Sequence, residues 1–347
     1  MKLAEITCRI ASDSDSSSWD EYVDAHPSRT FAHRWGWSSV LANSYGVKPY
    51  YILAEDNGKI AGVLPTVYMK SRFFGKFLIS LPWLDYGGPL ASDDQVAASL
   101  VDFAVAIAAR EKCRFMELRA VSRNHPALIN TDHRFAFMLD LTPGEEAVWK
   151  ALDGKAKNQV RKALKSNLEV RIGGIENLDS FYAIFSRNMR DLGTPVWPKR
   201  LFAEQFRYFE DDTEIALACL SEKPVAAALL IHYDDYSTVP SASSNRKYLN
   251  LSPNNILYWE IIRHCIRRGS RRFDFGRSSL DTGTYRFKNQ WVKDPTRQIW
   301  QYKLMTMDDL PKLDPSNPKF RLAISIWKRL PLPIANLLGP RIATKLP

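Results

Sequence analysis

The sequence predicts an α/β fold in which one unit of strands and helices is used twice. Residues 114–120 and 272–278 share the frame R-F-x-x-x-R-[A/S], and each follows an apolar stretch with helical spacing. Each helical stretch is preceded by two strand-like runs with turn-forming residues between them. The chain of 347 residues is also longer than one hydrophobic core usually covers, which favours two fused halves.

The first half is predicted to begin with a β-hairpin, because the turn-forming sequence Asp56-Asn57-Gly58 separates two β-rich runs. Asp93 or Asp94 can cap the helix that follows, since aspartate accepts hydrogen bonds from the first N–H groups of a helix. The predicted elements are strands at 50–54, 60–69 and 79–83, a loop at 85–89, a helix ending near Lys112 and a closing strand at 114–120.

The second half repeats this order around the turn sequence Ser221-Glu222-Lys223-Pro224. In its last strand, Phe273 and Phe275 face the core and Asp274 faces the other side, because side chains alternate along a strand. The predicted elements are strands at 214–220, 225–233 and 236–243, a helix from Ser252-Pro253 to Gly269, and the strand at 272–278.

The segment between the two halves is predicted to be helical and basic, and the segment after them is basic and rich in proline. Two stretches, 143–171 and 178–209, are predicted to be helical and to bridge the two sheets. The predicted division is a first unit at 1–145, a helical basic segment of the second half at 146–210, a second unit at 211–310, and a basic, proline-rich amphipathic tail at 311–347.

Cysteine usage and apolar runs indicate a cytoplasmic, reduced protein. Cys8, Cys113, Cys219 and Cys265 are far apart, and no histidine has zinc-ligand spacing, so buried thiols are expected rather than disulfides or a metal site. The N-terminus has no signal-peptide core, and no stretch reaches the ~18 apolar residues of a spanning helix.

The net charge of +10 is unevenly distributed. The tail from 315 to 347 carries six basic residues and no acid, and a second basic cluster lies on a predicted helix: Lys150, Lys155, Lys157, Arg161, Lys162 and Lys165. Such a cluster is either a solvated face or a site for phosphates, RNA or anionic lipid. For the tail, contact with the inner face of the membrane and packing against the protein body both stay open.

Several short motifs lack the partners that their chemistry needs. Asp281-Thr282-Gly283 matches an aspartic-protease triplet without a second copy. Asp274-Phe275-Gly276 matches a kinase triplet without a glycine-rich loop or H-R-D motif. The six histidines show no H-E-x-x-H pattern, and there is no G-x-S-x-G, so metal hydrolysis and Ser-His-Asp hydrolysis are not predicted.

Residues 31–305 nevertheless carry a series of motifs in order. These are Leu81-Pro82-Trp83-Leu84-Asp85-Tyr86-Gly87-Gly88-Pro89, Asn158-Gln159-Val160-Arg161-Lys162-Ala163, Arg190-Asp191-Leu192-Gly193-Thr194-Pro195-Val196, Ser252-Pro253-Asn254, Phe273-Asp274-Phe275-Gly276-Arg277-Ser278 and Gly283-Thr284-Tyr285-Arg286-Phe287-Lys288. In these motifs the chain resembles the FemAB-like family of peptidoglycan-bridge aminoacyltransferases, especially its branch associated with exosortase (PEP-CTERM) and exopolysaccharide loci.

The resemblance implies two tandem GNAT-type acyltransferase units, with mixed, largely antiparallel sheets flanked by helices. It implies transfer of an acyl or aminoacyl group to an amine of a cell-envelope or exopolysaccharide precursor. No permanently bound cofactor is implied, because the donor, acyl-CoA or aminoacyl-tRNA, is a co-substrate. The chain lacks the long charged coiled-coil insertion of some tRNA-using members, which counts against aminoacyl-tRNA.

The resemblance also implies roles for single residues. Lys288 would stabilise the oxyanion, with Asp274 and Tyr285 as further catalytic residues. The expected substrate-binding residues are Arg190 for a nucleotide- or lipid-linked sugar precursor, the loop Asp85, Tyr86, Gly87 and Gly88, and Arg277, Asn254 and Arg161. Structural roles stay open: a surface lysine on a strand for Lys288, an ion pair between Asp274 and Arg277, and a helix-surface charge for Arg190.

Two other functions stay open. A GNAT acetyltransferase using acyl-CoA usually has a pyrophosphate loop R/Q-x-x-G-x-G/A, and the nearest sequence here, at 72–77, ends in phenylalanine. A non-catalytic protein that binds anionic surfaces through the two basic segments is the third possibility.

Overall fold

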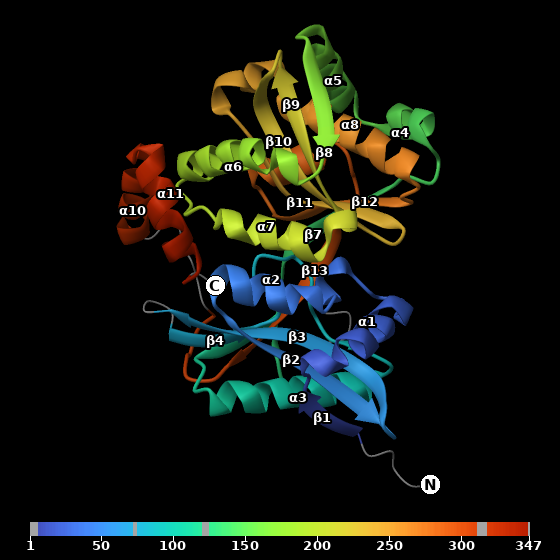
Figure 1. The fold of residues 1–347 in the computed structure, drawn as a ribbon, viewed down its shortest axis with the longest axis vertical. Coiled ribbons are helices and arrows are strands. Elements are labelled where there is room, and N and C mark those ends of the chain that lie inside the picture. Colours follow the sequence, from blue (N-terminus) through green and yellow to red (C-terminus); the bar gives the residue numbers. More distant parts are fainter. Residues whose placement is uncertain (1–5, 72–74, 120–124, 311–317, 346–347) are drawn as a thin grey trace. The chain divides into compact units, whose positions relative to one another are not determined.

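The structure is a computed structural model that describes residues 6–71, 75–119, 125–310 and 318–345 (Figure 1). It divides into unit 1 (Met1–Arg134, Gln298–Leu313 and Lys345–Pro347) and unit 2 (Phe135–Arg297 and Asp314–Thr344). The chain leaves unit 1 within strand β7 (Ile129–Asp140) and returns within β13 (Thr296–Leu304). Strands β7 and β13 therefore each begin in one unit and end in the other.

The sheet of unit 1 has the strand order β1-β2-β3-β4-β6-β13. Its strands are β1 (Ile6–Ile10), β2 (Lys48–Asp56), β3 (Lys59–Ser71), β4 (Gly75–Ile79), β6 (Phe115–Leu118) and β13, with the short β5 (Leu90–Ala91) beside β3. Neighbours are antiparallel except for β4 and β6, which are parallel. The sheet is thus mixed and largely antiparallel.

Helices cover both faces of this sheet (Figure 1). α3 (Asp94–Arg110) packs against one face, where it meets Tyr50, Ile52 and Ala54 of β2. α1 (Ser16–Ala25) and α2 (Gly36–Tyr45) contact β3 and β2, and Trp19 of α1 stacks on Tyr51. Short 3-10 turns lie at Asp13–Asp15 and Phe31–His33.

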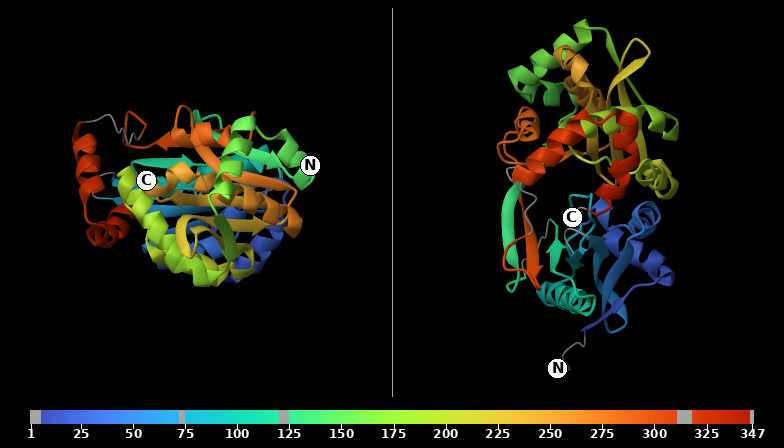
Figure 2. Two further views of the ribbon diagram at one scale, coloured as in Figure 1. Left: turned by 90° about the horizontal axis from the view of Figure 1, so that it is seen from above. Right: turned by 90° about the vertical axis from the view of Figure 1, so that its left-hand side faces the viewer.

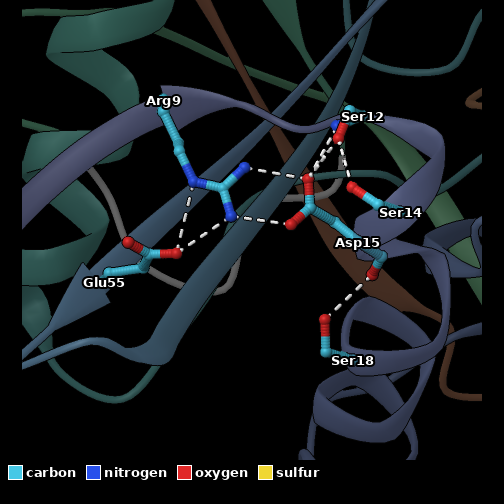
Figure 3. Close-up of polar contacts among 6 residues, drawn as sticks. All are labelled: Arg9, Ser12, Ser14, Asp15, Ser18 and Glu55. Atoms are coloured by element: carbon cyan, nitrogen blue, oxygen red, sulfur yellow. Dashed lines mark hydrogen bonds and ion pairs between the residues drawn. The ribbon is translucent and has the colours of Figure 1, made fainter.

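One arginine connects the edge strand to the start of α1 (Figure 3). Arg9 on β1 donates from Nη2 to Asp15 Oδ1 at 2.6 Å and to Glu55 Oε1 of β2 at 3.0 Å. The Arg9 bond, partly offset by burial, holds the pKa of Asp15 well below its usual range. The same carboxylate accepts the Ser12 N–H at 2.7 Å, so it also fixes the turn before the helix.

The sheet of unit 2 has the order β7-β12-β11-β10-β9-β8. Its further strands are β8 (Leu168–Gly173), β9 (Thr213–Leu220), β10 (Lys223–Tyr233), β11 (Tyr236–Ser244) and β12 (Arg272–Ser279). β9, β10 and β11 are successively antiparallel, and β11 is parallel to β12. Strands β2, β3, β4 and β6 follow the same succession, which confirms that one unit is used twice.

Two helical layers enclose the unit 2 sheet (Figures 1 and 2). On one face, α6 (Leu178–Leu192) and α7 (Lys199–Tyr208) bury an aromatic cluster centred on Phe181 and Phe202. On the other face lie α5 (Gly154–Lys165) and α8 (Pro253–Arg268). The remaining helices are α4 (Glu145–Ala151), α9 (Gly283–Lys288), α10 (Pro318–Arg329) and α11 (Leu332–Ala343), with 3-10 turns at Ile175–Asn177, Glu210–Asp212 and Arg246–Leu251.

Most predicted elements are confirmed. Both hairpins form, Asp93 caps α3 by accepting the Val96 N–H at 2.9 Å, and α8 begins at Pro253 and ends before Gly269. Three of the four cysteines are buried as free thiols, whereas Cys8 is half-buried. In the described ranges, no helix has the length and apolar character needed to cross a lipid bilayer.

Two predicted elements are wrong. The third strand of the first half spans Gly75–Ile79 rather than 79–83, because residues 80–83 form a turn in which Leu81 and Trp83 have positive φ. The end of the predicted helix at 143–171 is instead strand β8, which pairs with the edge of β9. Helices α4 to α7 all belong to unit 2 and include the basic cluster.

A polar cluster joins β9, β10 and α8 at the end of the sheet where β10 turns into β11. Nε2 of His232 and Nε2 of His264 donate to the same Glu214 oxygen at 2.8 and 2.7 Å. His232 Nδ1 lies 2.7 Å from the Ser237 hydroxyl. Burial alone would raise the pKa of Glu214, but the two histidines outweigh it and hold this pKa well below its usual range.

Glu214→Gln is therefore expected to lower the free energy of unfolding by about 1–3 kcal/mol, because a carboxylate acceptor of two imidazoles is lost. A carboxyl group whose pKa is lower in the folded state stabilises the fold fully at pH values above its unfolded-state pKa of about 4.3. This stabilisation is lost progressively as the pH falls below that value. Urea denaturation should show the full difference between wild type and variant at pH 7 and a smaller one near pH 3.

Glu222→Gln provides a matched control, because Glu222 is exposed in the turn between β9 and β10 and pairs at the surface with Arg171. Its loss is expected to change the stability by less than about 1 kcal/mol. Equal stability of wild type and Glu214→Gln at pH 7 would contradict the assigned role of the cluster.

Candidate active site

Strands β11 and β12 of unit 2 stop pairing toward their carboxyl ends. Within the described residues, their parallel ladder joins Tyr236–Thr238 to Arg272–Asp274, although β11 continues to Ser244 and β12 to Ser279. Backbone N–H and C=O groups that leave a ladder need other partners. Ligands also bind preferentially outside the carboxyl ends of parallel strands. This edge of the sheet is therefore the first candidate for a substrate site.

A tight backbone turn shapes β12 at the point where the strands separate. Asp274 is fully buried, and its Oδ1 accepts the N–H of Gly276 at 2.8 Å. Gly276 has a φ of 69°, a conformation that glycine adopts without steric cost. Burial, together with the nearby Asp274 carboxylate, raises the pKa of Tyr258 on α8. Asp274 thus fixes the strand from inside the core.

Lys288 brings a buried positive charge to this turn. It is the last residue of α9, a short helix that Thr282 caps by accepting the Tyr285 N–H at 3.1 Å. Only 8% of Lys288 is exposed, and its Nζ donates to the carbonyls of Gly276 at 2.9 Å and Arg277 at 2.8 Å. The alternative of a surface lysine on a strand is wrong. Because two carbonyl dipoles compensate the ammonium, the charge can be retained at a site largely shielded from water.

A cluster of aromatic rings lies on one side of Lys288. The ring centroid of Phe137, on β7, lies 6.0 Å from Nζ. Tyr285 packs edge-on against Phe137 and Phe135, with centroid separations of 5.1 and 5.5 Å. Tyr285 and Lys288 therefore lie beside the same Phe137 ring, and Lys288 contacts the backbone of Gly276 and Arg277, close to Asp274 in β12.

Buried polar atoms at the same edge have no hydrogen-bond partner. Asn254, at the start of α8, donates from Nδ2 to Ser244 Oγ at 3.3 Å, but its Oδ1 is unpaired among the described residues. Asn255 Nδ2 and Ser278 Oγ are likewise buried and unpaired within that part of the chain. Buried polar groups are normally satisfied, so these atoms suit a bound ligand.

Arg190 and Arg161 lie outside this group. Arg190, near the end of α6, donates to Asp191 Oδ1 at 2.7 Å and to the Leu330 carbonyl at 2.8 Å. Arg161 lies on the exposed face of α5, with its guanidinium carbon 5.7 Å from the centroid of Trp149. Arg161 is exposed on the surface of unit 2, whereas Arg190 is half-buried and already bonded to Asp191 and Leu330.

The loop Asp85, Tyr86, Gly87 and Gly88 belongs to unit 1. The Gly88 carbonyl lies 2.9 Å from Nε2 of His33, and burial lowers the pKa of His33 to about 4. Gly87 has a φ of 135°, which favours glycine at that position. Asp85 and Tyr86 are half-buried.

Arg119 holds the start of this loop, and no functional prediction included it. Its Nη1 donates to the Leu84 carbonyl at 2.9 Å, and its Nε donates to Glu117 at 2.7 Å. Arg119 is the second arginine of the repeated frame, so it corresponds to Arg277 in unit 2. The repeat itself was the signal that could have identified it.

The Glu214 cluster was also missed, because its three residues come from separate elements. Among the described residues it is the one group of histidine, cysteine and acidic side chains close enough to hold a metal ion. Each imidazole Nε2 already lies at hydrogen-bond distance from the Glu214 carboxylate, so these atoms are satisfied without a metal ion.

Comparisons with known proteins agree with this architecture. Residues 154–289, which include α5 to α9 and end just after Lys288, match the acetyltransferase (GNAT) domain family. None of the curated protein sequences matches the chain.

Solved structures with the same fold cover most of the chain. FemX is 12% identical, with a TM-score of 0.64 over 86% of this chain and 98% of that one. The C-terminal domain of a proposed lysylphosphatidylglycerol synthetase from Agrobacterium fabrum is 13% identical, with a TM-score of 0.56 over 83% and 91%. A tandem GNAT protein from the clavulanic acid biosynthesis pathway is 10% identical, with a TM-score of 0.55 over 88% and 100%. The chain thus has the tandem GNAT fold.

Proposed function

We propose that this protein is an N-acyltransferase of the FemAB-like kind, which transfers an acyl or aminoacyl group to an amine of a cell-envelope or exopolysaccharide precursor. One observation carries the proposal: the buried Lys288 ammonium lies where β11 and β12 part, within the segment that matches a GNAT domain. The fold shared with FemX and with the lysylphosphatidylglycerol synthetase domain supports an envelope precursor as the acceptor.

The chemistry needs a cation at this place. A neutral amine attacks the carbonyl carbon of an ester or thioester, and the carbonyl oxygen gains negative charge as the new C–N bond forms. The C–O or C–S bond of the donor then breaks, and the amine loses a proton. An ammonium aimed at the developing oxyanion lowers the barrier, with an effect on the order of 10²–10³-fold for one donor.

The neighbours of Lys288 are proposed to position it and to bind substrate. Asp274 is fully buried and bonded to the Gly276 N–H, so we assign it a positioning role in β12 rather than proton transfer. Tyr285 holds the aromatic wall beside Lys288. Arg277, near the end of β12, and Asn254, at the start of α8, are proposed to contact the donor.

Acceptor binding is proposed for the basic residues farther out. Arg161 is exposed on α5 and suits the phosphates of a nucleotide- or lipid-linked precursor. Arg190 would have to exchange its bonds to Asp191 and Leu330 for phosphate contacts. The loop Asp85–Gly88 is proposed to contact substrate through its backbone.

A second candidate is acetyl transfer from acyl-CoA to a small-molecule or sugar amine. It is favoured by the acetyltransferase description of the matching family and by the fold of the clavulanic acid pathway protein. The sequence at 72–77 that comes nearest to a pyrophosphate loop includes residues 72–74, which lie outside the described ranges. A non-catalytic role in binding anionic surfaces would use the cluster on α4 and α5 without Lys288.

The donor can be identified by direct binding. We expect acetyl-CoA or a charged tRNA to bind the purified protein, and the labelled group to pass to an amine-bearing peptidoglycan precursor or amino sugar. Transfer from acetyl-CoA to a simple amino sugar alone would favour the second candidate. Binding of every polyanion, with steep salt dependence and no transfer, would favour the non-catalytic role.

Lys288→Met is expected to lower kcat by roughly 10²–10³-fold, because the oxyanion loses its cation. Stability will also fall, by about 1–3 kcal/mol, because the carbonyls of Gly276 and Arg277 lose a donor. Rates must therefore be measured well below the melting temperature and normalised to the folded fraction from circular dichroism.

Lys293→Met is the matched control. Lys293 lies five residues further along, is exposed and pairs with Asp153, so its loss should leave kcat unchanged. A purely structural Lys288 would give a normalised kcat like that of the control, and that outcome would remove the catalytic assignment.

A further inference from the structure

Helix α11 presents its large apolar side chains to solvent and its small ones to the protein. Ala335, Gly339 and Ala343, spaced four residues apart, are buried. A Cβ atom on Gly339 would lie 2.8 Å from Val196 Cγ1, so the small residues allow a close approach to the chain after α6. On the side away from these residues, Leu337 is 60% exposed and Ile334 is 44% exposed; Leu338 and Ile342, at the flanks of the buried stripe, are exposed as well. This is the reverse of an ordinary surface helix, whose large apolar residues face the core.

Helix α10 also exposes large apolar side chains, although another, Ile324, faces the protein. Its inner side meets α6, where Ile324 lies against the position of Gly193. Its outer side carries Leu322 and Ile326, which are 64% and 55% exposed and lie one turn apart. Two consecutive helices thus each expose at least two large aliphatic side chains. Single exposed apolar residues scattered over a surface are ordinary, but a cluster of them indicates an interaction site.

Basic residues accompany these apolar side chains. Arg329 on α10 and Arg341 on α11 are exposed beside them, and residues 315–347 contain six basic residues and no acid. A partner that only covered apolar surface would not require this charge. A surface that is both apolar and anionic satisfies both features, and that combination is found where phospholipid headgroups meet acyl chains.

We propose that the outer faces of α10 and α11 are a docking surface for an anionic phospholipid membrane. Leu322, Ile326, Ile334, Leu337, Leu338 and Ile342 would enter the headgroup region, while Arg329 and Arg341 contact lipid phosphates. The inner faces stay packed on unit 2, where Ile324 lies against Gly193 and Gly339 lies against Val196. One side of these helices then packs against the protein body and the other side contacts the membrane, so the two alternatives for the tail are compatible.

The test is co-sedimentation of the full-length protein with vesicles of phosphatidylcholine, with and without phosphatidylglycerol. Binding is expected only with phosphatidylglycerol, and it should weaken at high salt. The double variant Leu337→Ser/Ile342→Ser is expected to bind at least roughly tenfold more weakly, because exposed apolar area is lost. Arg341→Gln should weaken binding roughly fivefold.

Ile175→Ser and Leu249→Ser are controls, because both residues are exposed aliphatic side chains elsewhere in unit 2. They should bind vesicles as the wild type does. Lys288→Met should also bind normally, so failure of the proposed acyl transfer and failure of membrane docking give different results.

Two outcomes would overturn the proposal. One is equal binding of wild type and Leu337→Ser/Ile342→Ser, or no binding to phosphatidylglycerol at low salt. The other is a wild-type dimer in lipid-free sedimentation velocity that the double variant loses, without vesicle binding, since a second copy of the chain would then cover the face.

Discussion

The bonds from Lys288 Nζ to the carbonyls of Gly276 and Arg277 are the interaction on which the candidate site depends. A lysine side chain has four rotatable bonds, and alone it would not define where its charge lies. Here two carbonyls of one strand fix it, and their direction is set by the left-handed turn at Gly276. The buried Asp274 carboxylate fixes this conformation by accepting the N–H of Gly276. The location of the charge is therefore a property of the β12 backbone.

The two units use the same sequence frame to different ends. In unit 1, the second arginine of the frame, Arg119, is buried and bonds both Glu117 and the Leu84 carbonyl, and its guanidinium lies 4.6 Å from the Trp300 ring centroid. In unit 2, the corresponding Arg277 contributes its carbonyl to Lys288. The Arg119 guanidinium, which contacts the Leu84 carbonyl and the Trp300 ring, stabilises the fold. The Lys288 ammonium instead lies where β11 and β12 stop pairing, where a ligand could bind. The same position of the frame thus supplies a side chain to the fold in unit 1 and a backbone carbonyl to Lys288 in unit 2.

Local patterns predicted most of the fold, because hairpin turns, helix caps and alternating strands are encoded by neighbouring residues. The strand at 168–173 was missed because it follows a helix without a strong break and forms only by pairing with β9. The site could be predicted only in part. Resemblance placed Lys288 and Asp274 near each other, but sequence alone did not show that Asp274 is buried. The Glu214 cluster escaped prediction because its members are brought together by tertiary packing of β9, β10 and α8.

The tail shows why helical periodicity cannot by itself identify the buried side. In α11, Ala335, Gly339 and Ala343 form one stripe and the large aliphatic residues form another, so both faces are apolar by composition. Hydrophobic area favours burying the large stripe. The small stripe instead faces the protein, where glycine allows contact with the Val196 backbone that a Cβ would block. Backbone proximity and shape therefore decide the orientation of this helix, and they leave its large side chains exposed.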